Sequence, residues 1–547
     1  MAQKETRPEN VPTFPPSGHP THPSPPEASV EHDELQQDVI LSRSEESVPP
    51  VASGEHDELQ PQVDNQASAV QKEQANKWAV MAIIAIGVFM ATLDTSIVNI
   101  SLPTIARYFG VPLNGAVEWV IIAYLVVIAG VLLTTGRVAD MIGHKPIWAA
   151  GLTIFTIGSA FCGFAPSLVF LIAARALQGL GGAMIMAISP AMLTGAFPAS
   201  ERGKALGLNA VVVALGVSTG PTLGGIITTS LSWRWIFFVN IPIGIIGVIL
   251  TLRVLKEKMR WGRGKFDPLG ALLLALGLIA LTLGLSFGQE WGWSSPLLIA
   301  NLVIGVLALI VLYIVERRVS DPVIDLSLLH NRVFLSANLS LILSFMALFA
   351  VSFMLPFYLE ELRNFTTEQS GLLLTPLPLT IAIIAPFSGS LADRIGTRWL
   401  AAGGLTVACI GLVLISQLDA HSSVWDIVWR LVVTGMGQAI FQSPNNSALM
   451  GAAPKGHQGS ASGFLATGRV VGQSLSVALA GAVFASLGGA AAGRALATNN
   501  NLSAAEIAAL QQIFSHGFQI TFIVCASIAA IGIFTSLVRG KEKFENR

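Results

Sequence analysis

Two ionisable residues inside long apolar stretches, Asp94 and Arg175, lie at similar depth. Asp94 comes about nine residues before the end of the first stretch, roughly 14 Å deep at 1.5 Å per residue. Arg175 comes about seven residues into the fourth, roughly 11 Å deep by the same rise. If the two stretches are neighbouring helices, these side chains can pair, and Gln178 one turn away can add a hydrogen bond. Because buried ionisable groups are costly in a membrane, we consider a role in proton coupling, with a purely structural ion pair as the alternative.

Three further ionisable residues are secondary candidates. Arg430 follows Asp426 by four residues, the usual spacing of an ion pair along one helix. Arg469 lies eight residues into a later apolar stretch, too deep to reach water easily, and has no partner nearby in the sequence. Glu360 lies at the end of a stretch, where water is close, so a solvated side chain is expected.

A pattern rich in glycine marks the fifth stretch. Its members are Gly216, Gly220, Pro221, Gly224 and Gly225. Glycines at i, i+4 and i+8 make a flat groove on one helix face, which allows another backbone to approach closely. Pro221 lacks an amide donor and so leaves the Val217 carbonyl without its helical partner, which favours a bend.

Two polar loops have matching patterns. The first contains Gly136, Arg137, Asp140, Gly143 and Lys145; the second contains Gly389, Asp393, Arg394, Gly396 and Arg398. We expect Asp140 to lie near the N-terminus of the helix that follows and to bind its free amides, with plain capping as the alternative.

The loop patterns belong to an internal repeat. They are offset by 253 residues, and a second pair of matching sites, Gly203 and Gly459, is offset by 256. About 20 apolar residues cross a membrane as a helix, and fourteen such stretches occur from Trp78 onward. Eight stretches separate each matched pair, so the two copies have the same orientation. We therefore predict an all-α membrane protein with two parallel six-helix halves and an inserted helix pair, an architecture typical of transporters.

Composition supports a membrane protein and excludes an ordinary soluble one. Apolar residues make up 52% and charged residues 12%, with a mean hydropathy of +0.64, whereas soluble domains are about a quarter charged. Residues 1–76 are acidic and rich in proline, which predicts disorder. We expect a disordered cytoplasmic tail at 1–76, the first half at 77–260, the inserted pair with its linkers at 261–330, and the second half with a short basic tail at 331–547.

Loop charge predicts the orientation. With the tail inside, alternate loops and the C-terminal tail hold twenty Lys and Arg, against four on the other side. Positively charged loops remain in the cytoplasm, so we predict a multi-pass protein of the cytoplasmic membrane with both termini cytoplasmic. The sequence shows no metal-ligand cluster, catalytic triad, phosphate loop or nucleotide fingerprint. We therefore expect no enzyme activity, no metal, no cofactor other than the proton-motive force and no nucleic-acid partner.

These motifs together resemble the major facilitator superfamily, in particular its fourteen-helix drug:proton antiporter branch. The first-helix signature runs from Leu93 to Pro103 and includes Asn99, a supporting polar residue beside Asp94. The resemblance implies that the Gly136–Lys145 loop latches the cytoplasmic gate, that the Arg175–Gly181 segment takes part in proton transfer, and that Gly216–Gly225 is the antiporter motif.

The leading hypothesis is an exporter of lipophilic or cationic compounds in exchange for protons, by alternating access. One alternative is a transporter of a single metabolite, amino acid or lipid, and another is a transport-inactive sensor or scaffold. The expected partners are the lipid bilayer and a small substrate, and also a periplasmic adaptor if the cell has two membranes.

The predicted topology can be tested at Gly292, in the turn between the two inserted helices. A cysteine introduced there should react with a membrane-impermeant maleimide added to intact cells, because the turn is expected to face outward. Labelling only from the cytoplasmic side would reverse the assigned orientation.

Overall fold

The computed structural model describes residues 76–111, 116–255, 266–286, 292, 295–319, 321–324, 326–454, 456–498 and 502–539. The predicted tail at 1–76 lies outside these ranges except for Asn76, which caps the first helix by accepting from the Trp78 amide. The described residues belong to one compact unit, Lys72–Arg547, and every regular element in them is helical.

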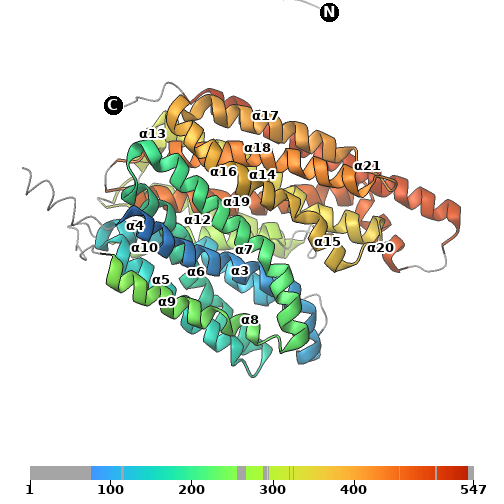
Figure 1. The fold of residues 1–547 in the computed structure, drawn as a ribbon, viewed down its shortest axis with the longest axis horizontal. Helices are drawn as coiled ribbons and strands as arrows, with labels where there is room; N and C mark the ends of the chain where they lie inside the picture. The colour runs from blue at the N-terminus through green and yellow to red at the C-terminus, as the bar shows by residue number, and fades with distance from the viewer. Residues whose placement is uncertain are drawn as a thin grey trace, which may run out of the picture. The chain divides into compact units, whose positions relative to one another are not determined.

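Figure 1 shows the helices in chain order by colour. The first group comprises α3 (Lys77–Phe109), α4 (Trp119–Ile142), α5 (His144–Gly163), α6 (Leu168–Ala196), α7 (Arg202–Ser230), α8 (Trp235–Phe238) and α9 (Asn240–Val254). The inserted pair is α10 (Pro268–Ser286) and α12 (Pro296–Glu316), followed by the short α13 (Leu326–His330). The second group comprises α14 (Arg332–Phe357), a π-helical turn (Tyr358–Leu362), α15 (Thr367–Leu374), α16 (Pro376–Ile395), α17 (Thr397–Ser416), α18 (Val424–Gly451), α19 (Gln458–Ser486), α20 (Gly489–Thr498) and α21 (Ala504–Leu537).

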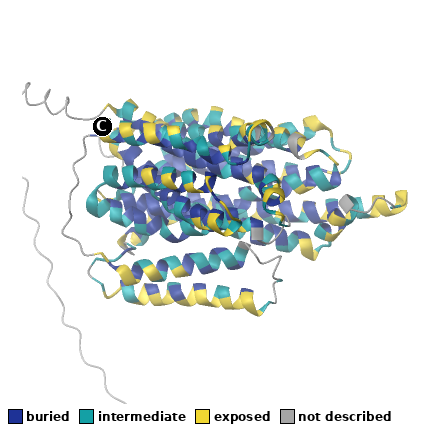
Figure 2. Cartoon of the chain, turned by 90° about the horizontal axis from the view of Figure 1, so that it is seen from below, coloured by how far each residue is buried: buried dark blue, intermediate teal, exposed yellow. Residues whose placement is uncertain are grey.

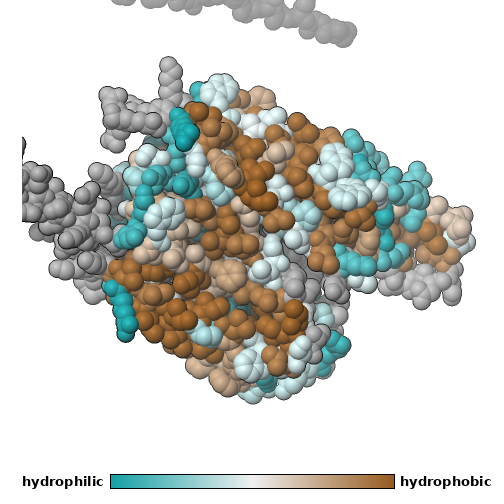
Figure 3. Space-filling view, viewed as in Figure 1, coloured by the Kyte–Doolittle hydropathy of each residue, from teal (hydrophilic) through white to brown (hydrophobic). Residues whose placement is uncertain are grey.

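Thirteen helical segments in the described ranges are long and apolar enough to cross a membrane, one fewer than the fourteen expected from the sequence. The segment that does not qualify is α18, which is 28 residues long but less apolar than the others. Its polar residues Ser443, Asn445 and Asn446 are buried against other helices. The apolar surface in Figure 3 covers the middle of the helices, and hydrophilic residues gather toward their ends.

Local sequence signals explain where helices begin. Ser167 caps α6, and Ser423 and Ser503 form capping boxes with Asp426 and Glu506 at the starts of α18 and α21. The two matched loops turn at Gly143 and Gly396, whose φ angles of 104° and 91° are strained for any residue with a Cβ.

The two groups of helices meet through two equivalent contacts. Helix α19 packs on α4, and α7 packs on α16. By the repeat offsets, α4 corresponds to α16 and α7 to α19, so the two contacts are the same contact made twice. The inserted helices pack on each other and α10 packs on α4. Figure 2 shows the buried residues gathered in the interior and the exposed ones on the outer faces.

Candidate functional site

Asp94 on α3 is fully buried and accepts three hydrogen bonds. Arg175 Nη1 on α6 lies 2.6 Å from Asp94 Oδ2, which confirms the expected contact between the two side chains. Gln178 Nε2 donates to Oδ1 at 2.8 Å, and Asn240 Nδ2 on α9 donates to the same oxygen at 3.0 Å. The charge of Asp94 is therefore compensated by one cation from α6 and hydrogen-bonded by two amides, one from α6 and one from α9.

Arg175 is held by α4 as well as by Asp94. Its Nε donates to the Val120 carbonyl at 2.9 Å, and Nη1 also donates to Gln178 Oε1 at 2.7 Å. The guanidinium lies over the Tyr124 ring, 4.2 Å from its centre, which adds a cation–π contact. Such enclosure fixes the arginine in one position.

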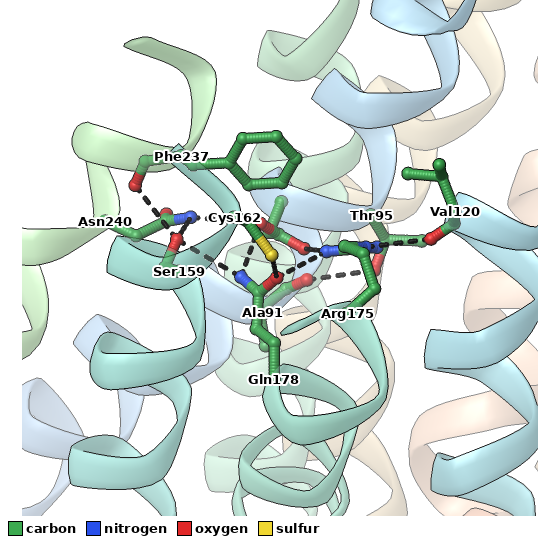
Figure 4. Close-up of polar contacts among 10 residues, drawn as sticks. Ala91, Thr95, Val120, Ser159, Cys162, Arg175, Gln178, Phe237 and Asn240 are labelled. Carbon is green, nitrogen blue, oxygen red and sulfur yellow. Dashed lines mark hydrogen bonds and ion pairs between the residues drawn. The ribbon is translucent and has the colours of Figure 1, made fainter. Parts of the chain in front are cut away.

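A second layer of hydrogen bonds orients the amides that bind Asp94 (Figure 4). Ser159 Oγ on α5 accepts from Asn240 at 3.0 Å and from Gln178 at 3.3 Å, and donates to the Phe237 carbonyl at 2.9 Å. All three partners of Asp94 present donors to it. A proton on this carboxyl needs an acceptor, so protonation requires at least one partner to move or reorient.

Asn99 does not take the supporting position expected of it. Its side chain is exposed, and Asn240 occupies the place beside Asp94 instead. Five residues along a helix correspond to a rotation of about 140°, so Asn99 cannot share a face with Asp94. The sequence reasoning missed Asn240, Ser159 and Tyr124. For Asn240 a signal was available, because it is an amide side chain within the apolar run that begins at Trp235.

The close helix approach expected at Gly216 and Gly220 is present. A Cβ at Gly216 would overlap the Thr92 side chain on α3, and a Cβ at Gly220 would overlap Ser96. Ser96 Oγ donates to the Val217 carbonyl at 2.8 Å, which satisfies the acceptor that Pro221 leaves without a helical donor. Thus α7 packs on α3 at the residues two positions before and after Asp94, on the opposite face of the helix.

The remaining glycines of this motif differ from the first two. Gly224 is buried, and its carbonyl accepts from Thr228 Oγ1 at 2.7 Å. Gly225 faces open space, with nothing within 4 Å of a Cβ built there. The helix assignment of α7 continues through Pro221 to Ser230.

Asp140 binds a different helix from the one predicted. Its carboxylate accepts from the Gly459 and Ser460 amides and from Ser460 Oγ, each at 2.7 Å. These groups form the N-terminus of α19, far along the sequence, and not that of the following helix α5. The expected chemistry, an acid at a helix N-terminus, is therefore found across the interface between the two helix groups.

The second loop makes the same contact in the reverse direction. Asp393 on α16 accepts from the Gly203 amide at 2.9 Å and from the Lys204 amide at 3.1 Å, at the start of α7. A Cβ at Gly136 would overlap the Gly459 carbonyl, and a Cβ at Gly389 would overlap that of Gly203. We call the helix ends that carry Asp140 and Asp393 the gate side; there the two groups are in tight contact.

Basic residues of these loops have separate contacts. Arg137 Nη2 lies 3.8 Å from Oδ1 of Asp321, which is in the segment after α12. Lys145 donates to the Leu252 carbonyl at 3.2 Å and to that of Leu255, at the end of α9. Arg394 is exposed.

The secondary candidates lie away from Asp94. The expected Asp426–Arg430 ion pair does not form, because Asp426 caps α18 through Ser423 and accepts from Trp429 Nε1. Arg430 stacks on Trp429 instead. Arg469 stacks on Phe345, 5.3 Å from the ring centre. Glu360 lies half-buried in the π-helical turn. Within the described ranges, no group of three or more His, Cys, Asp or Glu could hold a metal ion.

Comparison with known proteins identifies many relatives. The family model of the Major Facilitator Superfamily matches residues 84–278 and 269–477. The riboflavin transporter RibZ of Clostridioides difficile is 38% identical over 414 residues, covering 75% of this chain and 88% of that protein. The multidrug resistance protein Stp of Mycobacterium tuberculosis is 33% identical over 413 residues, covering 75% and 76%. The crystal structure of the human organic anion transporter MFSD10 (TETRAN) has a similar fold, with a TM-score of 0.58, 17% identity and coverage of 85% and 100%.

The packing of α7 on α3 can be tested by comparing two glycines of one motif. Gly220→Leu should lower the thermal unfolding midpoint of the purified protein by several degrees, because overpacking a tight contact costs about 1–3 kcal/mol. Gly225→Leu, at an open position, should leave the midpoint within a degree or two. Equal midpoints for both variants would contradict the close approach.

The gate contact predicts the accessibility of a buried position on α19. Ala461 is fully buried, so a cysteine there, with the three native cysteines replaced, should react slowly with a maleimide in the purified protein. Asp140→Ala removes a helix cap, which costs about 1 kcal/mol, or roughly fivefold in an opening equilibrium. The labelling rate should rise accordingly, whereas Asp419→Ala, an exposed carboxylate in another loop, should not change it. An unchanged rate in Asp140→Ala would show that this contact does not hold the gate side closed.

Proposed function

The chain belongs to the drug-efflux branch of the Major Facilitator Superfamily, and from this premise we propose that it is a proton-driven antiporter. It is a transporter by family. In the proposal it exports lipophilic, cationic or otherwise toxic compounds across the cytoplasmic membrane, using the proton-motive force and no bound cofactor. Relatives that are named as multidrug resistance proteins support this substrate class.

The observation that carries the proposal is the environment of Asp94. Exchange needs a group that holds a proton in one state and loses it in another, so that substrate and proton are not carried together. Asp94 is buried in a segment apolar enough to span a membrane, and its charge is stabilised by Arg175, Gln178 and Asn240. Because all three partners are donors, loading a proton must rearrange them, and a change in side-chain contacts is what an alternating carrier requires.

The state of the gate side fits a carrier that alternates between two conformations. Both loop aspartates bind the opposite helix N-terminus, so the path is closed at this side. Breaking these hydrogen bonds and re-forming them elsewhere is a discrete change, which suits two stable states. We assign the gate side to the cytoplasm from the loop charges, so this conformation would open outward.

A fourteen-crossing topology with both termini in the cytoplasm completes the proposal. Helix α18 supplies the fourteenth crossing, because its 28 residues are long enough and its polar residues Asn445 and Asn446 face protein. The bilayer and a small substrate are the expected partners, and an adaptor protein is an additional partner in a double-membrane cell.

One observation favours a second candidate, a carrier for a single dedicated solute. A relative with 38% identity is named as a riboflavin transporter, so a drug-type sequence pattern is compatible with a nutrient substrate. Competition in the transport assay below separates the two: a broad exporter accepts several unrelated lipophilic compounds, whereas a dedicated carrier is inhibited by one class alone.

The role of Asp94 can be tested with inverted membrane vesicles. Asp94→Asn keeps the size of the side chain and removes its titration. Ethidium should therefore cause no proton release and should not accumulate uphill, and only downhill equilibration is expected to remain. The driving force lost is substantial, since a charge crossing 100 mV gains about 2.3 kcal/mol and each pH unit adds about 1.4 kcal/mol per proton.

Asp419→Asn is the matched control, because it makes the same chemical change at an exposed loop position. It should retain coupled transport at the wild-type rate. Full proton-coupled transport by Asp94→Asn at equal protein level would overturn the assignment of Asp94.

A further inference from the structure

Arg469 on α19 is a partly buried cation without a counter-charge in the described part of the chain. In the described part of the chain it makes no hydrogen bond or ion pair, and its Nε is buried without a partner. Its guanidinium contacts the Phe345 ring of α14. By comparison, Arg175 at the proton site has a carboxylate, an amide and a carbonyl as partners. An arginine in an apolar region at such cost, without a structural partner, indicates a ligand.

Carboxylates on the neighbouring helices are all engaged elsewhere. The helices that pack most on α19 are α14, α4, α6, α10, α18, α20 and α21, and among them only three carry an acid within their bounds: Asp140 on α4, Asp426 on α18 and Glu506 on α21. Asp140 binds the N-terminus of α19, about ten residues from Arg469. Asp426 and Glu506 cap their own helices. None of them neutralises the guanidinium.

The position of Arg469 coincides with the end of the closed gate. Residues 459–468 of α19 are all buried, on every side of the helix, and Arg469 is the first partly exposed residue beyond them. It lies eleven residues from the start of α19, about 16 Å at 1.5 Å per residue, which is close to the middle of a ~30 Å hydrocarbon core. The side chain is thus placed where the sealed region gives way to a more accessible one.

Unsatisfied polar atoms accompany the arginine. Asn338 Oδ1 on α14 lies against Gly468, the residue before Arg469, and it is buried without a hydrogen bond. Thr467 Oγ1 is also buried without a partner. The guanidinium and the aromatic ring, on two adjacent helices, can together bind a planar, ring-bearing molecule with an acidic group.

Packing alone does not require a cation here. The repeat relates Gly203 to Gly459, and the same offset relates Arg469 to Val213 on α7. The equivalent position of the other half is therefore filled by a small apolar side chain. The arginine is a departure from the repeat, which favours a function specific to the second half.

We propose that Arg469, with Phe345 beneath it, binds the carboxylate of a lipophilic aromatic acid, so that the substrates include organic anions. The inference rests on the proposed transport function and extends it, because that function was argued for lipophilic and cationic compounds. The planar guanidinium can bind a carboxylate through two parallel hydrogen bonds, and the ring below offers a stacking surface.

The test is equilibrium binding to the purified full-length protein in phosphatidylcholine nanodiscs, which contain no anionic lipid. The probes are tritiated 2-naphthoate and its neutral analogue 2-naphthamide, which have the same ring system and differ in charge. The wild type should bind naphthoate at least tenfold more tightly than naphthamide. Arg469→Gln should bind both alike, and Arg469→Lys should keep part of the preference.

Arg332→Gln is the control variant, because it removes an exposed arginine at the start of α14, the helix that carries Phe345. It should retain the wild-type preference. The inference is overturned if the wild type shows no preference for the anion, or if Arg469→Gln keeps it; the first result needs no variant to fold. Adding phosphatidylglycerol distinguishes a lipid ligand from a soluble one: strong suppression of naphthoate binding would assign the site to an anionic lipid and overturn its role in substrate binding.

The result of this binding test does not depend on whether the proposed antiport is confirmed. Binding in nanodiscs involves no proton gradient, so anion preference can be found even if Asp94→Asn shows that coupling lies elsewhere. Conversely, proton-driven ethidium export without any naphthoate preference would leave the antiporter in place and remove the anion site.

Discussion

The carboxylate of Asp94 cannot remain charged in an apolar interior unless the protein replaces the water around it, and this requirement organises the first helix group. Asp94 on α3 is satisfied from α6 and α9, and Arg175, which neutralises it, is held in turn by α4. Ser159 on α5 orients the two amides. One buried charge therefore connects five helices, because leaving one member of a buried ion pair without its partner costs about 3–5 kcal/mol.

Closing the gate side depends on a second electrostatic device, which is used twice. An aspartate at the end of one helix binds the free amides at the start of another, and each helix group supplies one acid and one N-terminus. The glycines beside these residues allow the backbones to approach closely. Since the polar part of both contacts consists of a few hydrogen bonds to helix N-termini, these bonds can break and re-form without unfolding either helix group.

Much of this was predictable from the sequence, and the failures have physical causes. Similar depth along the apolar stretches predicted that Asp94 and Arg175 can pair if their helices are neighbours, and the structure shows that they do. The partner of Asp140 was predicted wrongly because the reasoning was local, whereas the helix that it binds lies more than 300 residues away. The signal existed, since the Asp140/Asp393 and Gly203/Gly459 pairs repeat with nearly the same offset. Asn99 was expected beside Asp94 because the two are close in sequence, although the helical rotation directs them to different faces. Helix α18 was counted as an apolar span, although its buried polar residues lower its hydropathy.

The geometry also indicates how a proton at Asp94 can affect the distant gate. Helix α4 touches Arg175 through Val120 and Tyr124 at one end and holds α19 through Asp140 at the other. Helix α7 begins at the amides held by Asp393 and packs on the face of α3 opposite Asp94. One gate contact is therefore joined to the proton site directly by α4, and the other is joined by α7 to the helix that carries Asp94. In the proposed exchange, α19 carries the substrate site, because Arg469 comes directly after the buried segment whose N-terminal amides bind Asp140. A symmetric pair of gate contacts can in this way link a proton site in one half with a ligand site in the other.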